Sequence, residues 1–242
     1  MCHYRRHRAP RHCAPWRFPI RPVLVALAAG LSLSSCCLAA GGHHAVDDAA
    51  LLEPGQCNVE AWAARSNVDR RRLQHVGSAC RVLDVELGLN VDRATTAVDP
   101  TARLLGVQLK WATELQPTLA LGAVVAVNRH DHAPRMQRIV LVPLTWTPRE
   151  DLAVHLNVGR DVHGSGPHHT PRGIAVEWQP TAAWQGLAEY FHDGQRPLRR
   201  LGLRRFFGPN VTLDLSYART GSTAETAKED WWTLGLSWAF ER

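Results

Sequence analysis

Acidic residues are missing from the first forty positions, which hold six arginines: Arg5, Arg6, Arg8, Arg11, Arg17 and Arg21. An apolar run from residue 23 to 33 follows, and small residues close the stretch at Ala39 and Ala40. This order is typical of a secretory signal, and the run is too short to span a bilayer as a helix. We therefore expect residues 1–40 to be a signal peptide. Removing its six arginines from the 28 basic residues leaves 22 against 22 acids, a balance that does not support a basic nucleic-acid-binding surface.

Motifs of soluble enzymes are also absent. The sequence has no phosphate-binding glycine loop and no dinucleotide fingerprint. His155 and Asn157 share one face of a strand, but no serine is placed beside them, and Ser216 and Ser237 lie in no recognisable nucleophile motif. Hydrolysis requires a nucleophile with a base in reach and a group that orients it. We therefore expect no enzyme activity, no catalytic residues and no cofactor.

Cysteine is scarce outside the leader, where only Cys57 and Cys80 remain. In an exported chain two cysteines favour one disulfide, and a pair of small buried thiols is the alternative. The leader itself contains LSSC, ending at Cys36, which resembles the lipobox that precedes an acylated cysteine. Ordinary cleavage near residue 39 or 40 is the interpretation we favour, because short motifs match by chance.

The cleavage point decides one metal-binding hypothesis. A cut after residue 40 would leave Gly41, Gly42 and His43 as the first three residues. Their amine, amide and imidazole nitrogens can form the square-planar site that suits Cu(II) or Ni(II). His43 is therefore a candidate metal ligand. His130, His132, His163, His168 and His169 lie in two loops without a recognised zinc spacing, and we interpret them as solvated side chains.

Helical periodicity is nearly absent after residue 57, and apolar and polar residues alternate instead. In residues 81–92, for example, Leu83, Val85, Leu87, Leu89 and Val91 share one face. We expect about twelve strands of roughly nine to eleven residues, the length at which a tilted strand crosses a membrane. Short connections at 113–118, 147–150, 180–183 and 208–210 alternate with longer ones at 93–101, 129–135, 161–172, 193–197 and 219–229. That alternation is typical of an outer-membrane barrel.

These features predict an all-β, antiparallel, up-and-down transmembrane barrel over residues 57–242, with both chain ends on the periplasmic side. Residues 41–56 lack a strand pattern and are expected to form a mobile periplasmic lead-in. Cys57 would enter the first strand, and Cys80 would lie in the turn after the second, on the same rim. A secreted β-sandwich is the alternative, because its strands also alternate. Aromatic residues near the strand ends favour the barrel: Trp62, Trp111, Trp146, Trp178, Trp184, Tyr190, Tyr217, Trp232 and Trp238.

The final strand, WWTLGLSWAF, places Trp232, Leu234, Leu236, Trp238 and Phe240 at alternate positions. It resembles the C-terminal signal strand of Gram-negative outer-membrane β-barrels, although Glu241 and Arg242 follow its last aromatic residue. The resemblance implies location in the bacterial outer membrane and recognition by the barrel-assembly machinery. HAVDDA (44–49) and PGQC (54–57) further resemble the lead-in of small, uncharacterised transporter-like barrels, which implies no particular substrate.

Charged residues on the polar face would line the lumen: Asp84, Glu86, Lys110, Glu177, Glu189, Arg200, Arg204 and Asp214. Opposed charges across a pore would favour small polar solutes. Alternatively, each charge pairs with a neighbour, Arg200 with Glu189 or Asp214 and Lys110 with Glu86, and the network fills the lumen. We expect passage or binding of small polar solutes, with outer-membrane lipid and lipopolysaccharide as partners and no nucleic acid. A plugged structural or adhesive barrel without transport is the alternative.

Overall fold

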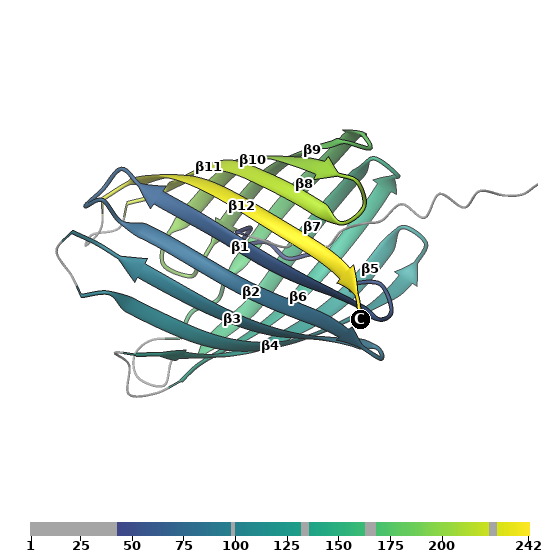
Figure 1. Cartoon of the computed structure of the whole chain (residues 1–242), viewed down its shortest axis with the longest axis horizontal. Helices are drawn as coiled ribbons and strands as arrows, with labels where there is room; N and C mark the ends of the chain where they lie inside the picture. Colours follow the sequence, from purple (N-terminus) through teal and green to yellow (C-terminus); the bar gives the residue numbers. More distant parts are fainter. Residues whose placement is uncertain (1–42, 98–99, 132–135, 163–167, 223–226) are drawn as a thin grey trace, which may run out of the picture. The chain divides into compact units, whose positions relative to one another are not determined.

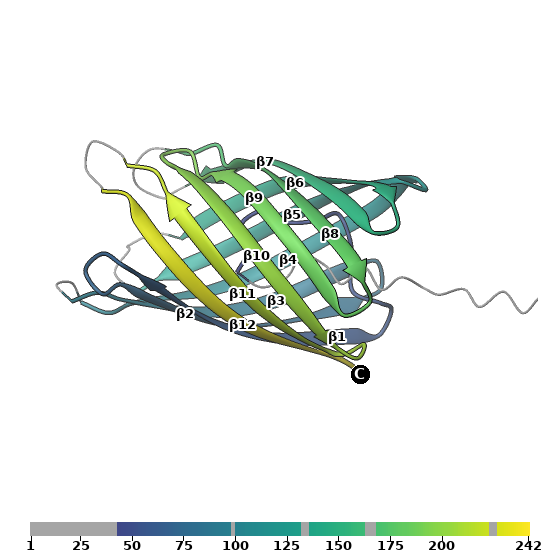
Figure 2. The same cartoon turned by 90° about the horizontal axis from the view of Figure 1, so that it is seen from above.

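A closed antiparallel barrel makes up the computed structural model, which describes residues 43–97, 100–131, 136–162, 168–222 and 227–242. Each strand pairs with the next in sequence, and β12 closes against β1 (Figures 1 and 2). The predicted all-β barrel is therefore confirmed. Its strands are β1 Gln56–Ser66, β2 Arg72–Val82, β3 Val85–Thr95, β4 Ala102–Gln116, β5 Leu119–His130, β6 Gln137–Arg149, β7 Leu152–Val162, β8 Arg172–Thr181, β9 Trp184–His192, β10 Pro197–Phe207, β11 Val211–Thr220 and β12 Glu229–Glu241.

The apolar face of the strands points outward. Leu87 is 47% exposed and Leu236 is 52% exposed, whereas Glu86 and Arg204 are buried. A sandwich would bury the leucines and expose the charges, so that alternative is wrong. Closure satisfies every strand edge within the sheet, as a hydrocarbon environment requires. None of the described residues forms a helix of the length and apolarity that a membrane crossing requires.

Aromatic side chains form two bands on the outside. Trp111, Trp146 and Trp178 lie near the short turns, whereas Tyr190 and Trp232 lie near the opposite ends of their strands, and all five are exposed. Such bands match the two interfaces of a bilayer.

Trp62 is an exception among the predicted interfacial aromatics. It faces the lumen and stacks on His75 with ring centroids 4.9 Å apart. The expectation that Trp62 belongs to the outer band is wrong, because its position in β1 has the parity of inward-facing Glu60.

Short turns join the strands at one end, where β1 begins and β12 ends (Figure 1). One of them corrects two expectations. Leu83 and Asp84 form the turn between β2 and β3, and Leu83 adopts a positive φ of 56°. Both side chains are exposed, so Leu83 does not extend the strand face and Asp84 does not line the lumen. The alternating pattern continued through this turn and concealed it.

The disulfide between Cys57 and Cys80 is confirmed, with an S–S distance of 2.04 Å. The two residues face each other in the register of β1 and β2. Cys80 therefore lies inside β2, two residues before its end, and not in the following turn.

The segment before β1 differs most from expectation. Residues 43–55 belong to the expected periplasmic lead-in, yet His43, Val46, Asp48, Ala49 and Leu52 are all buried. Their partners are inward-facing residues of several strands, so this segment lies inside the barrel. We call residues 43–52 the plug. A charged barrel interior offers hydrogen bonds to a short irregular chain, which needs partners for its backbone.

Candidate functional site

One half of the plug is bound by β9 and β10. The guanidinium group of Arg200 donates to the backbone carbonyl of His43. Oε2 of Glu189 accepts the backbone N–H groups of Ala45 and Val46, each at 2.8 Å. Since Arg200 also pairs with Glu189 at 3.1 Å, one ion pair of the wall holds both a carbonyl and two amides of the plug.

The other half is bound by strands on the opposite side of the barrel. Nζ of Lys110 in β4 donates to Oδ1 of Asp47 at 2.8 Å and to Oδ1 of Asp48 at 2.7 Å. Thr145 in β6 accepts the N–H of Ala49 at 2.8 Å. Lys110 is only 2% exposed. Removing one partner of such a buried ion pair is strongly destabilising, so these contacts fix the plug firmly.

The end of the plug is bound at the rim that carries the short turns. The backbone N–H of Leu52 donates to Oε2 of Glu86 at 3.2 Å, and Arg81 donates to the carbonyl of Leu52 at 2.9 Å. The alternative of neighbouring charge pairs predicts a contact between Lys110 and Glu86. In the structure, a plug amide hydrogen-bonds Glu86 and the plug carboxylates bind Lys110.

Glycines of the wall make room for the plug. A β-carbon on Gly173 in β8 would lie 2.6 Å from Cγ2 of Val46. A β-carbon on Gly122 would lie 3.5 Å from Cα of Ala49, and one on Gly202 would lie 3.4 Å from Cε1 of His44. The tight contact at Gly173 leaves no space for any side chain while the plug is in place.

His43 is enclosed by the wall and by its neighbour. Its ring lies 4.4 Å from that of His44 and 6.5 Å from that of Trp62, centroid to centroid. Burial first, and then the positive charges of Arg200 and Arg204, lower the pKa of His43 to about 3. The predicted copper site also requires Gly41 and Gly42, which lie outside the described residues, so it stays a prediction.

The charges on β8 to β11 pair along the wall. Arg204 donates to Asp214 at 2.7 Å, and Gln185 donates to Glu177 at 3.1 Å. Together with the pair of Arg200 and Glu189, these contacts match the alternative of neighbouring pairs. They do not match the expected opposed charges across the pore, because Arg200 and Arg204 each pair with an acid on an adjacent strand.

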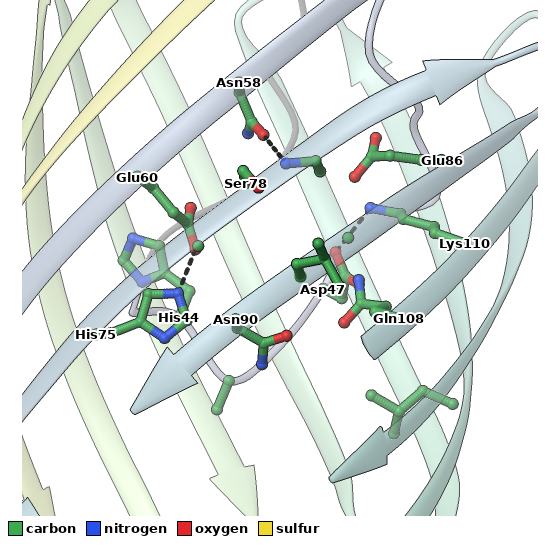
Figure 3. Close-up of a pocket in the computed structure, with 16 residues that line it drawn as sticks. His44, Asp47, Asn58, Glu60, His75, Ser78, Glu86, Asn90, Gln108 and Lys110 are labelled. Carbon is green, nitrogen blue, oxygen red and sulfur yellow. Dashed lines mark hydrogen bonds and ion pairs between the residues drawn. The ribbon is translucent and has the colours of Figure 1, made fainter. Parts of the chain in front are cut away.

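A cavity of about 260 Å³ remains between the plug and the wall of β1 to β4. Asn58, Glu60, His75, Asn90 and Gln108 point toward it, and Asp47 and Lys110 lie at its edge (Figure 3). Gly77 and Gly88 line it too, and their missing side chains leave space. Part of the lumen is therefore open and polar.

His75 is fixed between two carboxylates. Its Nδ1 lies 2.7 Å from Oδ1 of Asp92, and its Nε2 lies 3.1 Å from Oε1 of Glu60. Trp62 stacks on its ring. These contacts hold the imidazole rigidly against the cavity.

Sequence reasoning missed the uncharged part of this site. Asn58, Asn90 and Gln108 occupy inward positions of the same alternation that placed Glu86 and Lys110 inside. Their strand parity is the signal that places them inside, although they carry no charge.

The loop histidines do not form a metal site in the described part of the chain, where no group of three His, Cys, Asp or Glu residues could hold a metal ion. His130 hydrogen-bonds Gln137 at 3.1 Å, and His169 hydrogen-bonds Gln195 at 2.8 Å. His132 and His163 lie outside the described residues.

An apolar exterior, aromatic bands and a charged interior around a closed sheet define a β-barrel of the bacterial outer membrane. The chain belongs to the family described as "Uncharacterised conserved protein UCP029691", whose model matches residues 28–240. No curated protein matches the chain in sequence.

Solved channels share the fold at low sequence identity. The KdgM porin aligns with a TM-score of 0.64 and 8% identity, over 76% of this chain and 99% of its own. An outer-membrane channel from Pseudomonas putida F1 aligns with a TM-score of 0.61 and 11% identity, over 80% and 98%. The NanC porin aligns with a TM-score of 0.58 and 12% identity, over 74% and 98%. At such identities the likeness concerns the fold.

Proposed function

We propose that this protein is an outer-membrane channel for small polar solutes, in which the plug narrows the lumen to the polar cavity beside β1 to β4. The observation that carries the proposal is that cavity of about 260 Å³, lined by polar side chains inside a closed barrel. A barrel with a purely structural role would gain stability by filling this space, because empty polar volume leaves hydrogen-bonding groups without protein partners.

The fold comparisons support the same function. The three solved structures aligned above, with TM-scores of 0.58 to 0.64, are named as porins or channels. One structure of the KdgM porin, which aligns with a TM-score of 0.61, is described as a complex with disordered oligogalacturonate. Passage would be diffusion with electrostatic selection, without a cofactor or a catalytic step.

The plug gives this channel a closed or narrowed state. Its contacts span opposite sides of the wall, from Glu189 in β9 to Lys110 in β4, and so obstruct the centre. Passage of a solute larger than the cavity requires the plug to move. The plug is bound to the wall by hydrogen bonds and ion pairs, not by covalent bonds. Movement of the plug therefore leaves the barrel wall intact.

Single-channel recording in planar bilayers tests the proposal. We expect small conductance steps from the folded wild-type protein and larger steps from a variant lacking residues 43–52. A mobility shift between unheated and heated samples on gels serves as the control that both proteins fold. Folded protein without conductance in either form would favour the plugged structural barrel, whose outer surface contacts lipid and lipopolysaccharide.

The predicted assembly signal is a separate proposal. Trp232, Leu234, Leu236, Trp238 and Phe240 all lie on β12, which closes the barrel against β1. If the barrel-assembly machinery binds this strand, the strand that closes the barrel lies at the machinery while the barrel is inserted into the membrane.

A further inference from the structure

The cavity beside β1 to β4 differs from the rest of the lumen in its chemistry. Elsewhere the inward charges are paired, as in Arg204 with Asp214. Around the cavity, the amides of Asn90 and Gln108 form no hydrogen bond with any residue that the structure describes. Asn58 uses its Oδ1 to accept the N–H of Ala79 at 3.0 Å, which leaves its NH₂ group available.

The charged residues of the cavity are already engaged. Lys110 binds Asp47 and Asp48, and Oε1 of Glu60 binds His75. Of the residues that line the cavity, Asp47, Glu60 and Glu86 are acidic, Lys110 is basic, and His44 and His75 carry imidazole rings. Lys110 is held by two carboxylates, and both ring nitrogens of His75 lie against carboxylates of Glu60 and Asp92. Neither group is therefore offered to an anionic ligand, and the acids repel one.

Amide groups select a particular kind of ligand. Each offers both donors and an acceptor, as does a hydroxyl group, so a hydroxyl-rich neutral molecule can satisfy all of them at once. The volume of about 260 Å³ holds about nine water molecules at roughly 30 Å³ each. It therefore fits a solute the size of one monosaccharide and no longer chain.

We propose that the cavity lined by Asn58, Asn90 and Gln108 is a binding site for a neutral, hydroxyl-rich solute of monosaccharide size. This inference rests on the proposed channel function and names the class of solute it carries. The plug residues His44, Ala45 and Asp47 form one wall of the site. A bound solute therefore touches the plug and the barrel together.

Uptake into proteoliposomes of three labelled probes of similar size tests the charge preference: glucose, gluconate and glucosamine. We expect glucose to enter on the order of 10-fold faster than gluconate, because the acids lining the cavity disfavour an anion. Faster entry of gluconate or glucosamine than of glucose would overturn the proposal. Equal entry of all three would also overturn it while leaving the channel function intact.

Substitution of the free amides tests the site itself. Asn90→Ala combined with Gln108→Ala removes neutral hydrogen bonds, and we expect the half-saturating glucose concentration to rise about 3- to 10-fold. Gln116→Ala, at the exposed end of the same strand as Gln108, is the matched control and should not change it. Identical half-saturation in both variants would refute the site.

Equilibrium titration separates binding from transport. Glucose is titrated calorimetrically into the detergent-folded protein, so the result does not depend on passage through the membrane. Heat of binding in the wild-type protein that the double variant lacks would support the site. If no probe then entered the vesicles, the channel function would fail and the binding site would stand. Absence of glucose binding in the wild-type protein would sink the inference.

Discussion

Val46 of the plug and Gly173 of β8 are in contact so close that a β-carbon on Gly173 would lie 2.6 Å from Cγ2 of Val46. Val46 is fully buried and cannot turn away without moving the plug. Gly173→Ala is therefore expected to displace the plug, since overpacking a filled interior is destabilising by about 1–3 kcal/mol. Single-channel recording should show a conductance several-fold above that of the wild-type protein.

Two companion variants separate this contact from general damage to the wall. Val46→Ala removes Cγ2, so adding it to Gly173→Ala should return the conductance toward the wild-type value. Gly186→Ala on the outer face of β9, where a β-carbon meets only a carbonyl oxygen at 3.9 Å, should have no effect. Equal conductance in Gly173→Ala with and without Val46→Ala would contradict the contact.

Lys110→Met should also release the plug. The substitution leaves Asp47 and Asp48 facing the interior without the ammonium group that binds both. Removing one partner of a buried ion pair costs about 3–5 kcal/mol. This loss exceeds what a few hydrogen bonds between the plug and the wall contribute. A cysteine introduced as Ala49→Cys, buried in the wild-type arrangement, should then react rapidly with a water-soluble maleimide.

Neutralising the plug carboxylates provides the control for that experiment. Asp47→Asn with Asp48→Asn in the Lys110→Met background removes the two negative charges that Lys110 no longer balances, so labelling of Ala49→Cys should slow again. Fast labelling in all backgrounds, including wild-type Lys110, would mean that the plug leaves the lumen spontaneously.

The barrel wall could be derived from the sequence because its alternation is regular. Leu87, Leu203 and Leu236 face outward as their parity predicts, and Glu86 and Lys110 face inward. Period two fixes the face of every residue once one is placed. The same rule failed at Leu83, where a left-handed residue ends the strand without a glycine or proline to mark the turn.

The plug could not be derived in the same way. Residues 43–52 form no regular structure, and their contacts with the wall join residues 29 to 157 positions apart in sequence. The periodicity of the sequence does not predict a contact of this kind. The adjacent acids Asp47 and Asp48 are the one sequence feature that indicates the plug, because they can balance the inward-facing charge of Lys110.

A charge on the outer face should reveal the depth of the bilayer. Leu215 lies at the middle of β11, pairs in register with Leu203 and Leu234, and is exposed. Leu215→Arg should destabilise the barrel in lipid by about 2–4 kcal/mol, and Trp238→Arg near the rim by no more than about 1 kcal/mol from its charge. Urea titrations in liposomes measure both, and equal losses would contradict the predicted orientation in the membrane.

Loss of the disulfide should weaken the start of the barrel. Cys57 and Cys80 are 23 residues apart in sequence, and closing a loop of this length stabilises a fold by about 3 kcal/mol in the chain-entropy model. Cys57→Ala with Cys80→Ala should therefore lower the temperature at which the folded gel band disappears. Reductant should lower it in the wild-type protein and leave the double variant unchanged, whereas no difference between the two proteins would argue against a stabilising bridge.

Acidification should favour release of the plug through His43. Inside the lumen its pKa is lowered to about 3, whereas a solvated histidine titrates near 6.5. The released plug therefore binds a proton below about pH 6.5 that the inserted plug does not, and insertion weakens by about 1.4 kcal/mol for each pH unit below that value, down to about pH 3. Conductance should rise between pH 7 and pH 5, and His43→Phe should flatten that rise, because its ring fills similar space without a titrating nitrogen. A wild-type conductance independent of pH over this range would contradict the prediction. Either His43 is then protonated inside the lumen, or the plug does not control the current. Labelling of Ala49→Cys at pH 5 distinguishes these two cases.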